Sequence, residues 1–422
     1  MKTIYVYWDD AQTVSPLPVG RLYADAIRGK EVFSFEFDTS WLKQSVCRHL
    51  DPDLQLFSGP QYVSDKKPNF GVFTDSCPDR WGRVLIERRE SVRAKEEGRG
   101  RRILLESDFL LGVHDETRMG ALRFKIAEDG AFLDDEPNYS APPLASLREL
   151  QEACKHLEAD DEDADVRRWL QILLAPGSSL GGARPKANIR KPDGSLWIAK
   201  FPSQKDRMDV GAWEAVAMTL AARCGVEVAP FEIVRYGKNA TFMTRRFDRN
   251  PEGKRVHFTS AMSMLGYADG QTDGCSYLEI AEWISRYSAQ ATVDLVQMWR
   301  RIVFNIAISN CDDHLRNHGF LLTEKGWRLS PAYDLNPSYY GGGLSLNITE
   351  ADNSLNMDLA REVAPFFGVS EKEAEEIIGV VRDAMSGWRH VASKMGISRE
   401  EQEKMAKAFV FLNNMGDETS TR

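Results

Sequence analysis

The sequence has no long apolar run and no clustered cysteines. Its 422 residues include six cysteines, scattered along the chain without a Cys-x-x-Cys pair. We therefore expect neither a disulfide framework nor a structural zinc site, and the pattern is typical of a protein of the reducing cytoplasm. No apolar stretch reaches about 18 residues, and the opening residues become acidic by Asp9, so neither a membrane-spanning helix nor a signal peptide is expected.

An excess of positive charge is also missing. The formal net charge is -9, which argues against broad nucleic-acid binding by this chain alone and leaves a basic protein partner open. With 42% hydrophobic and 28% charged residues, a chain of this length can bury a large core and is expected to divide into two or three domains.

The stretch from residue 293 to residue 337 contains the densest group of candidate catalytic residues. A nearly continuous apolar run over Val293–Ile308 predicts a fully buried helix. A polar loop, an alternating hairpin at 320–329 and a further acid follow, and the polar groups are Asn310, Asp312, Asp313, Asn317 and Asp334. This order of elements predicts two carboxylates side by side at the base of a cleft.

The spacing of these polar residues points to phosphoryl transfer. Asp312, four residues and then Asn317 reproduce the interval of a kinase catalytic loop, in which the Asp accepts the hydroxyl proton and the Asn holds magnesium. Asp334 stands where a kinase keeps its second metal-binding Asp. Two alternatives remain open: a solvated polar loop with capping acids, and a metal hydrolase, because His314 and His318 lie four residues apart among acids.

A second candidate constellation begins with a glycine-rich loop at 177–186. Glycines allow successive backbone N–H groups to approach an anion without a Cβ in the way. The loop is not a Walker A motif, because Ala183 stands where that motif requires Lys, and the G-x-G-x-x-G pattern is missing. A surface turn is the alternative interpretation.

The residues after this loop strengthen the nucleotide-binding interpretation. A hairpin predicted over 187–201 has a last strand that ends on Lys200. Asp209 precedes a predicted helix that runs to Cys224 and contains Glu214. Glycine loop, strand Lys and helix Glu is the order of parts in the small lobe of a kinase, where the Glu holds the Lys against the phosphates.

The remaining segments complete the predicted organisation. Short alternating runs before residue 45 predict a small β unit. Residues 51–80 are predicted to be loop, and residues 80–102 are predicted to form a charged helical stretch. Two strands are predicted at 226–236 and 241–246, and the chain beyond about 255 is mainly helical. We predict an α+β fold: a β-rich N-terminal domain (1–148) and a two-lobed kinase-like part, with a small lobe (149–249) and a helical large lobe (250–422).

Several motifs together resemble one known family. SSLGGARPK, WIAKFPS, TRRFDR, SNCDDHLRNHGFL and SPAYDLNPS are similar to segments of the HipA-type serine/threonine kinases, the toxins of bacterial toxin–antitoxin modules. VGRL and FSFEFDTSWL resemble the N-terminal domain of that family. The resemblance extends over most of the chain, and one departure is Ser260–Leu265, where typical members carry Glu-Asp-x-Cys-Gln after the hinge.

The resemblance implies a role for each matching residue. Asp312 would be the catalytic base, Asn317 and Asp334 would hold Mg²⁺, and Ser179, or Ser178 in its place, would be autophosphorylated. The residues expected to bind ATP are Ser179, Gly181, Gly182, Ala183, Lys186, Lys200, Glu214, Arg246 and Phe247, of which Arg246 and Phe247 would lie at the adenine hinge.

The resemblance also implies cofactors and partners. An ATP- and Mg²⁺-dependent kinase of this type would act as a toxin on a protein substrate, with an aminoacyl-tRNA synthetase as the suggested target. Its partner would be a HipB-type antitoxin with a helix-turn-helix domain, so contact with DNA would be indirect, and no membrane partner is expected. The alternative is a catalytically weak relative that acts mainly as an antitoxin-binding co-repressor.

Overall fold

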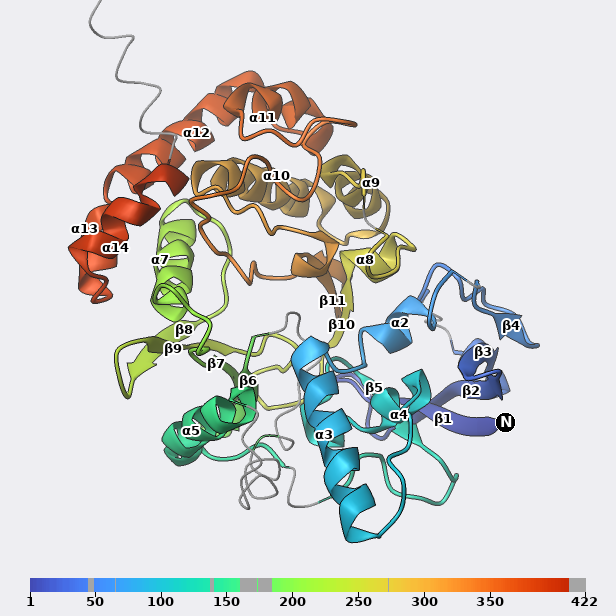
Figure 1. Cartoon of the computed structure of the whole chain (residues 1–422). Helices are drawn as coiled ribbons and strands as arrows, with labels where there is room; N and C mark the ends of the chain where they lie inside the picture. The colour runs from blue at the N-terminus through green and yellow to red at the C-terminus, as the bar shows by residue number, and fades with distance from the viewer. Residues whose placement is uncertain are drawn as a thin grey trace, which may run out of the picture. The chain divides into compact units, whose positions relative to one another are not determined.

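The chain divides into two compact units. The computed structural model describes residues 1–44, 49–64, 66–136, 140–159, 173, 184–271 and 273–409. The first unit comprises residues 1–205 and 245–269, and the second comprises 206–244 and 270–422. Figure 1 shows the elements of both units by residue number. Among the described residues, no helix is both long enough and apolar enough to span a membrane.

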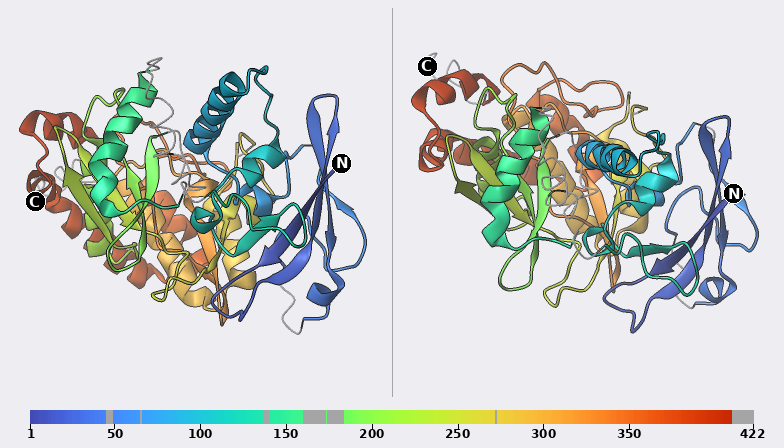
Figure 2. Two further views of the ribbon diagram at one scale, coloured as in Figure 1. Left: turned by 90° about the horizontal axis from the view of Figure 1, so that it is seen from below. Right: turned by 60° about the horizontal axis from the view of Figure 1, so that its bottom comes forward.

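A five-stranded antiparallel sheet opens the first unit and confirms the predicted β-rich start. Its strands, in the spatial order β4-β3-β2-β1-β5, are β1 (Lys2–Trp8), β2 (Leu17–Ile27), β3 (Lys30–Phe37), β4 (Gln61–Tyr62) and β5 (Leu122–Lys125). Alternate residues of β1 point into the core, so Ile4 and Val6 are buried. Arg28 and Gly29 both have positive φ, the backbone of a two-residue hairpin turn, and Figure 2 shows the long β2–β3 hairpin that this turn closes.

The described part of the first unit also contains helices and two further β elements. They are α1 (Thr39–Leu42), α2 (Gly71–Thr74), α3 (Arg80–Glu96), α4 (Glu106–Leu111), α5 (Leu147–Glu158), the hairpin of β6 (Lys186–Arg190) and β7 (Leu196–Lys200), β10 (His257–Ser260) and α8 (Ala261–Met264). The segment 51–80, predicted as loop, therefore contains β4 and α2. The charged helix ends at Glu96, before the predicted 102. It begins where the side chain of Asp79 accepts a hydrogen bond from the backbone N–H of Gly82, at 2.8 Å.

Hydrogen bonds join the segment after residue 245 to the N-terminal part of the first unit. Arg246 Nη1 donates to the carbonyl oxygen of Thr117 at 2.7 Å, and the N–H of Gly120 donates to Asp248 Oδ2 at 2.9 Å. These long-range bonds place 245–269 in the first unit, so the unit boundaries do not coincide with the predicted domain boundaries at 148/149 and 249/250. The three-domain division stays a prediction.

The second unit is mainly helical. Its elements are α7 (Val210–Arg223), the hairpin of β8 (Phe231–Arg235) and β9 (Ala240–Arg245), α9 (Tyr277–Tyr287), α10 (Ala291–Ala307), the hairpin of β11 (Gly319–Thr323) and β12 (Gly326–Leu329), α11 (Met357–Val363), α12 (Glu371–Ser386), α13 (Trp388–Lys394) and α14 (Arg399–Met405). α7 begins at the predicted residue, since the side chain of Asp209 caps it, and it stops before Gly225, whose φ is +75°.

Helix α10 forms the centre of the second unit and lies beside α9 (Figure 1). Met298, Trp299 and Ile302 are completely buried, as the apolar run predicts. The prediction of full burial is wrong for the first turn, because Val293 is 52% exposed. Trp299 Nε1 donates to the carbonyl oxygen of Ala360 at 2.8 Å and so anchors α11 to α10.

Candidate active site

A sharp turn at the end of α10 begins the loop with the candidate catalytic residues. Ser309 has φ +51°, a left-handed conformation that few residues other than glycine adopt. The N–H of Asn310 donates to the carbonyl oxygen of Asn305 at 2.9 Å, and Ser309 Oγ donates to the carbonyl oxygen of Ala408 at 2.8 Å. These bonds hold the turn in a conformation that costs backbone energy, as is common near functional sites.

The two adjacent carboxylates of the loop lie in different environments. Asp312 is exposed to solvent, whereas Asp313 is 1% exposed. Asp313 Oδ2 accepts hydrogen bonds from Tyr277 Oη at 2.5 Å and Asn305 Nδ2 at 2.7 Å, and His318 Nε2 lies 2.9 Å from the same oxygen. Of the two, only Asp312 is accessible to the hydroxyl group of a substrate.

Asn317 lies in a single helical turn, η4 (Leu315–Asn317), and is 4% exposed. Its Nδ2 atom donates to the carbonyl oxygen of Asp312 at 2.9 Å. This bond uses the amide nitrogen and leaves Oδ1 as the atom of the side chain that suits a cation. The Asp-x4-Asn spacing read from the sequence therefore corresponds to a direct contact in the structure.

Asp334 follows the β11–β12 hairpin in a left-handed conformation, with φ +58°. Asn336 Nδ2 donates to Asp334 Oδ1 at 3.3 Å, and the N–H of Asn336 lies 3.4 Å from Asn310 Oδ1, a long hydrogen bond. The segment with Asp334 is thus tied to the start of the candidate catalytic loop. Asp334 is thus, after Ser309, the second non-glycine residue with positive φ in this group of candidate residues.

The donor set suits magnesium better than zinc. Asn317 and Asp334 offer oxygen atoms, and Mg²⁺ is commonly held by one or two such side chains together with the phosphates of a substrate. In the part of the chain that the structure describes, no group of three His, Cys, Asp or Glu side chains is arranged to hold a metal ion. His318, half of the suggested zinc pair, lies against Asp313.

The glycine-rich loop cannot be compared with its prediction. Ser178, Ser179, Gly181, Gly182 and Ala183 lie outside the described residues, so their roles in ATP binding and autophosphorylation stay predictions.

Lys186, at the other end of the predicted loop, is 2% exposed in β6. Its Nζ lies 2.9 Å from Oδ2 of the buried Asp79, and its carbonyl oxygen accepts a bond from Trp81 Nε1 at 3.1 Å. A buried lysine needs a charge partner, and Asp79 supplies one. The Lys186 ammonium group is thus paired with Asp79, the residue that caps α3, and is buried instead of exposed at the surface.

Lys200 and Glu214 lie in different units. Lys200 is the last residue of β7 in the first unit and is half-buried, and Glu214 is 3% exposed in the middle of α7 in the second. Their predicted pairing at the phosphates stays a prediction.

Arg246 and Phe247, predicted at the adenine hinge, lie among residues of the first unit. Arg246 is 2% exposed, and its Nε and Nη1 atoms donate to Asp248 Oδ1 and Asn188 Oδ1, both at 2.8 Å. The ring of Phe247 packs against that of Phe258, with centroids 5.7 Å apart. The Arg246 guanidinium is therefore occupied by protein groups.

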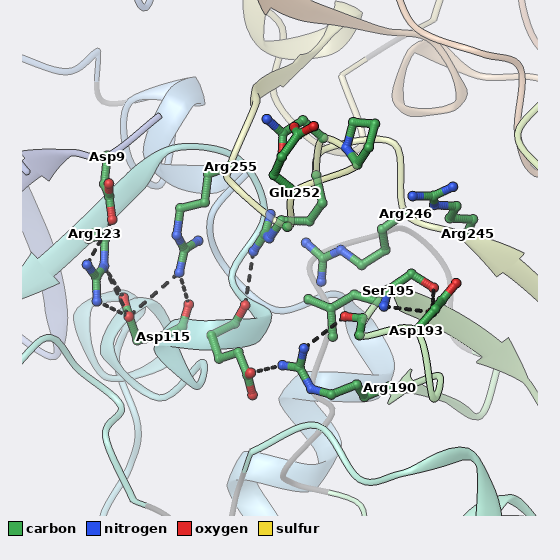
Figure 3. A pocket seen from close by; sticks show the side chains of 17 residues that line it. Asp9, Asp115, Arg123, Arg190, Asp193, Ser195, Arg245, Arg246, Glu252 and Arg255 are labelled. Carbon is green, nitrogen blue, oxygen red and sulfur yellow. Dashed lines mark hydrogen bonds and ion pairs between the residues drawn. The ribbon is translucent and has the colours of Figure 1, made fainter. Parts of the chain in front are cut away.

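Arg246 also lines a polar cavity of about 610 Å³ in the first unit, which the sequence analysis missed (Figure 3). Most of its arginines donate to carboxylates or backbone carbonyls; Arg249 Nη2, for example, donates to the carbonyl oxygen of Glu116 at 2.9 Å. Burial raises the pKa of Asp248, but Arg246 and Arg249 outweigh it and hold that pKa below its ordinary value. The lining arginines are Arg123, Arg190, Arg245, Arg246, Arg249 and Arg255.

Comparison with known proteins identifies the family to which the chain belongs. A family model described as the HipA-like C-terminal domain matches residues 178–388, which is half of the chain. The chain belongs to the HipA family. The α+β, two-lobed kinase-like fold class with an N-terminal domain is confirmed by a solved structure from Shewanella oneidensis, a complex of the toxin–antitoxin system HipA, HipB and its operator DNA. That structure aligns with a TM-score of 0.63 and 17% identity over 97% of this chain and 95% of the other.

Two curated relatives are similar to part of the chain. The serine/threonine-protein kinase toxin HipA of Shewanella oneidensis is 26% identical over 272 residues, covering 57% of this chain and 60% of the relative. A relative from Sinorhizobium fredii is 27% identical over 253 residues, covering 51% of this chain and 59% of its own length. The matched part of the chain thus spans about three fifths of the curated relatives, so activity, substrate and partners of this protein remain to be proposed.

Proposed function

We propose that this protein is an ATP- and Mg²⁺-dependent serine/threonine protein kinase of the HipA type. The observation that carries the proposal is the exposed carboxylate of Asp312, whose backbone carbonyl is held by Asn317 at 2.9 Å. A base must be open to the substrate hydroxyl, and a metal-binding amide beside it is the arrangement of a kinase catalytic loop.

Each residue then has a task in the transfer. The hydroxyl oxygen of the protein substrate attacks the γ-phosphorus of ATP, the bond from phosphorus to the ADP oxygen breaks, and the hydroxyl proton passes to Asp312. Asn317 and Asp334 hold Mg²⁺, which when bound offsets the negative charge of the phosphates. Most of the rate enhancement in such a reaction comes from positioning and charge neutralisation.

We propose fewer nucleotide-binding residues than the sequence alone suggests. By analogy with the small lobe of other kinases, Lys200 is assigned to the phosphates and Glu214 to the role of the helix glutamate. Lys186 and Arg246 are left out, because each is committed to a buried carboxylate, Asp79 and Asp248 respectively. Phosphorylation of Ser179, or of Ser178, is proposed to regulate the loop.

The biological role is proposed from the relatives. The Shewanella oneidensis relative is named a kinase toxin, and the solved complex contains HipB and operator DNA. By analogy, this protein is the toxin of a toxin–antitoxin module that inhibits growth by phosphorylating a protein, with an aminoacyl-tRNA synthetase as the first target to test. A HipB-type antitoxin is its partner, and DNA is reached through that partner.

A catalytically weak co-repressor is the second candidate function. The observation that favours it is the composition of the same solved complex, in which a HipA protein is assembled with HipB on DNA. A pure binding module has no need of an accessible Asp312 beside a metal-binding Asn317, so we place the kinase first.

Phosphosite mass spectrometry tests the proposal. The protein is incubated with Mg-ATP, alone and with cell lysate, beside the D312N variant as the matched control. We expect phosphate on the Gly-rich loop and on substrate proteins with the parent and none with D312N. Equal phosphorylation by both proteins, or none by the parent, would overturn the kinase function.

A further inference from the structure

We propose that Asp313 is a positioning residue: a buried carboxylate that fixes the conformation of the loop on which Asp312 and Asn317 lie and connects this loop to Asp334. Its effect on phosphoryl transfer rests on the proposed function, whereas its effect on the loop does not. Asp313 does not touch the reacting atoms, and it acts through hydrogen bonds.

Three segments of the second unit place a polar group against one oxygen of Asp313. Tyr277 is the first residue of α9, Asn305 lies in the last turn of α10, and His318 follows η4. Tyr277 and Asn305 are completely buried, and His318 is 2% exposed. A carboxylate removed from water is tolerated only when hydrogen-bonding groups surround it. These three buried side chains provide that environment for Asp313.

The charges around Asp313 support an acceptor role. Arg301 is 2% exposed and lies one turn before Asn305 on α10. Burial lowers the pKa of Arg301 to about 10, and the negative charge of Asp313 opposes that shift. Burial and the same negative charge raise the pKa of the Tyr277 phenol well above its ordinary value, so the phenol keeps its proton and donates it to the hydrogen bond.

One branch of the network leads to Asp312 and Asn317. Asp313 and His318 flank η4, and their contact of 2.9 Å closes the loop across that turn. Asn317 lies between these two residues, and its Nδ2 donates to the carbonyl oxygen of Asp312, the residue immediately before Asp313. The positions of the candidate base and of a candidate metal ligand therefore both depend on the bond between Asp313 and His318.

The other branch leads to Asp334 through three amides. Asn305 donates to Asp313 and accepts from Asn310 Nδ2 at 3.1 Å, so only one orientation of its amide satisfies both neighbours. Asn310 Oδ1 accepts from the N–H of Asn336, whose side chain donates to Asp334. A continuous path of hydrogen bonds thus runs from Asp313 to the second candidate metal ligand.

Asp294 provides a matched control. It is a carboxylate on α10, the helix that carries Asn305, and like Asp313 it is 1% exposed. It accepts hydrogen bonds from Ser288 Oγ at 2.6 Å, from Arg328 Nε at 3.0 Å and from the N–H of Leu329 at 3.0 Å. D294N therefore reproduces the loss of a buried charge in the same unit, but these hydrogen bonds join Asp294 to Ser288 and β12, not to the candidate catalytic loop.

The test compares the parent, D313N, Y277F and D294N by two measurements. The first is amide hydrogen exchange of residues 309–318, which does not require activity. The second is steady-state phosphorylation over a range of Mg²⁺ concentrations. Outer groups that orient metal ligands typically change metal affinity or activity by about 10- to 100-fold, so D313N should lower kcat and raise the half-saturating Mg²⁺ concentration by factors of this order.

The expected pattern is specific. D313N accelerates exchange of the loop and lowers kcat, Y277F does both to a smaller degree, and D294N lowers the melting temperature but leaves exchange of residues 309–318, kcat and Mg²⁺ dependence near the parent values. The inference is overturned if D313N leaves loop exchange unchanged, or if D294N has the same effects. If the parent transfers no phosphate, the proposed function fails, and the exchange data still decide whether Asp313 orders the loop.

Discussion

Asp312 and Asp313 are neighbours in the chain, but the carboxylate of Asp312 is exposed while that of Asp313 is buried against Tyr277, Asn305 and His318. The two acids therefore have different tasks. One is open to a substrate, and the other is an acceptor inside the unit. This division separates two residues that are chemically identical in the sequence, and it determines the expected phenotype of each.

D312N is expected to abolish phosphoryl transfer while preserving the fold. The amide keeps the shape of the side chain and removes the proton acceptor, which typically contributes about 10²- to 10⁴-fold. Because Asp312 is exposed, the melting temperature should stay close to that of the parent. Transfer rates and thermal unfolding are measured on the same preparations, and transfer at the parental rate would show that Asp312 is misassigned.

D334N is expected to weaken binding of Mg-ATP itself. Asn tolerates the left-handed backbone at this position, where φ is +58°, so the variant should fold normally. Loss of the charged ligand should lower Mg-ATP affinity, whereas D312N should retain it. Calorimetric titration of both variants with Mg-ATP separates the two roles, and equal losses of affinity would contradict this division.

S179D is expected to reduce ATP affinity, and S179A is expected to retain it. A phosphate on this serine would add about -1.5 to -2 charges close to the phosphates of ATP, and the Asp side chain imitates part of that charge. Both variants are compared for ATP affinity and for toxicity on expression, with Ser178 unchanged. Parental affinity in S179D, with no phosphate on either serine during turnover, would refute self-inhibition through this loop.

K186M is expected to destabilise the first unit without changing ATP affinity. Removing the ammonium group leaves the buried carboxylate of Asp79 without its 2.9 Å partner, and breaking a buried ion pair typically costs about 3–5 kcal/mol. Thermal unfolding and ATP titration well below the melting temperature distinguish stability from binding. Reduced ATP affinity of the folded variant would show that Lys186 does contribute to nucleotide binding.

Asp51 is expected to make the first unit less stable as the pH rises from about 4 to about 6. Burial raises the pKa of this carboxyl from 3.8 to about 6, although the N–H groups of Val72 and Asp53 donate to it. Over this range the folded state keeps a proton that the unfolded state has released, so stability falls by about 3 kcal/mol and is constant above the folded pKa.

The D51N variant tests this dependence, because its amide does not titrate. D51N should be less stable than the parent at pH 4.5, since the amide cannot accept both backbone hydrogen bonds. The difference in melting temperature between parent and variant should shrink between pH 4.5 and pH 7.5. A difference that is the same at both pH values would show that Asp51 has an ordinary pKa.

The sequence by itself determined the local elements and the spacing of the candidate catalytic loop. The cap at Asp209 and the stop before Gly225 define α7, and the hairpin after Asn317 follows from alternation over ten residues. The Asp312-x4-Asn317 interval needs no distant partner, because the two residues contact each other within one loop. Such features depend on neighbours in the chain, so their pattern is visible in the sequence.

Only the tertiary structure decided which buried polar groups pair. Tyr277 and Asp313 are 36 positions apart, and Arg246 and Thr117 are 129 positions apart. Asn305, the polar residue within the apolar stretch 302–308, was a signal of the Asp313 network in the sequence, besides Asp313 and His318 themselves. Which groups meet in the core depends on how distant elements pack, and the pairing follows from the cost of burying a polar group without a partner.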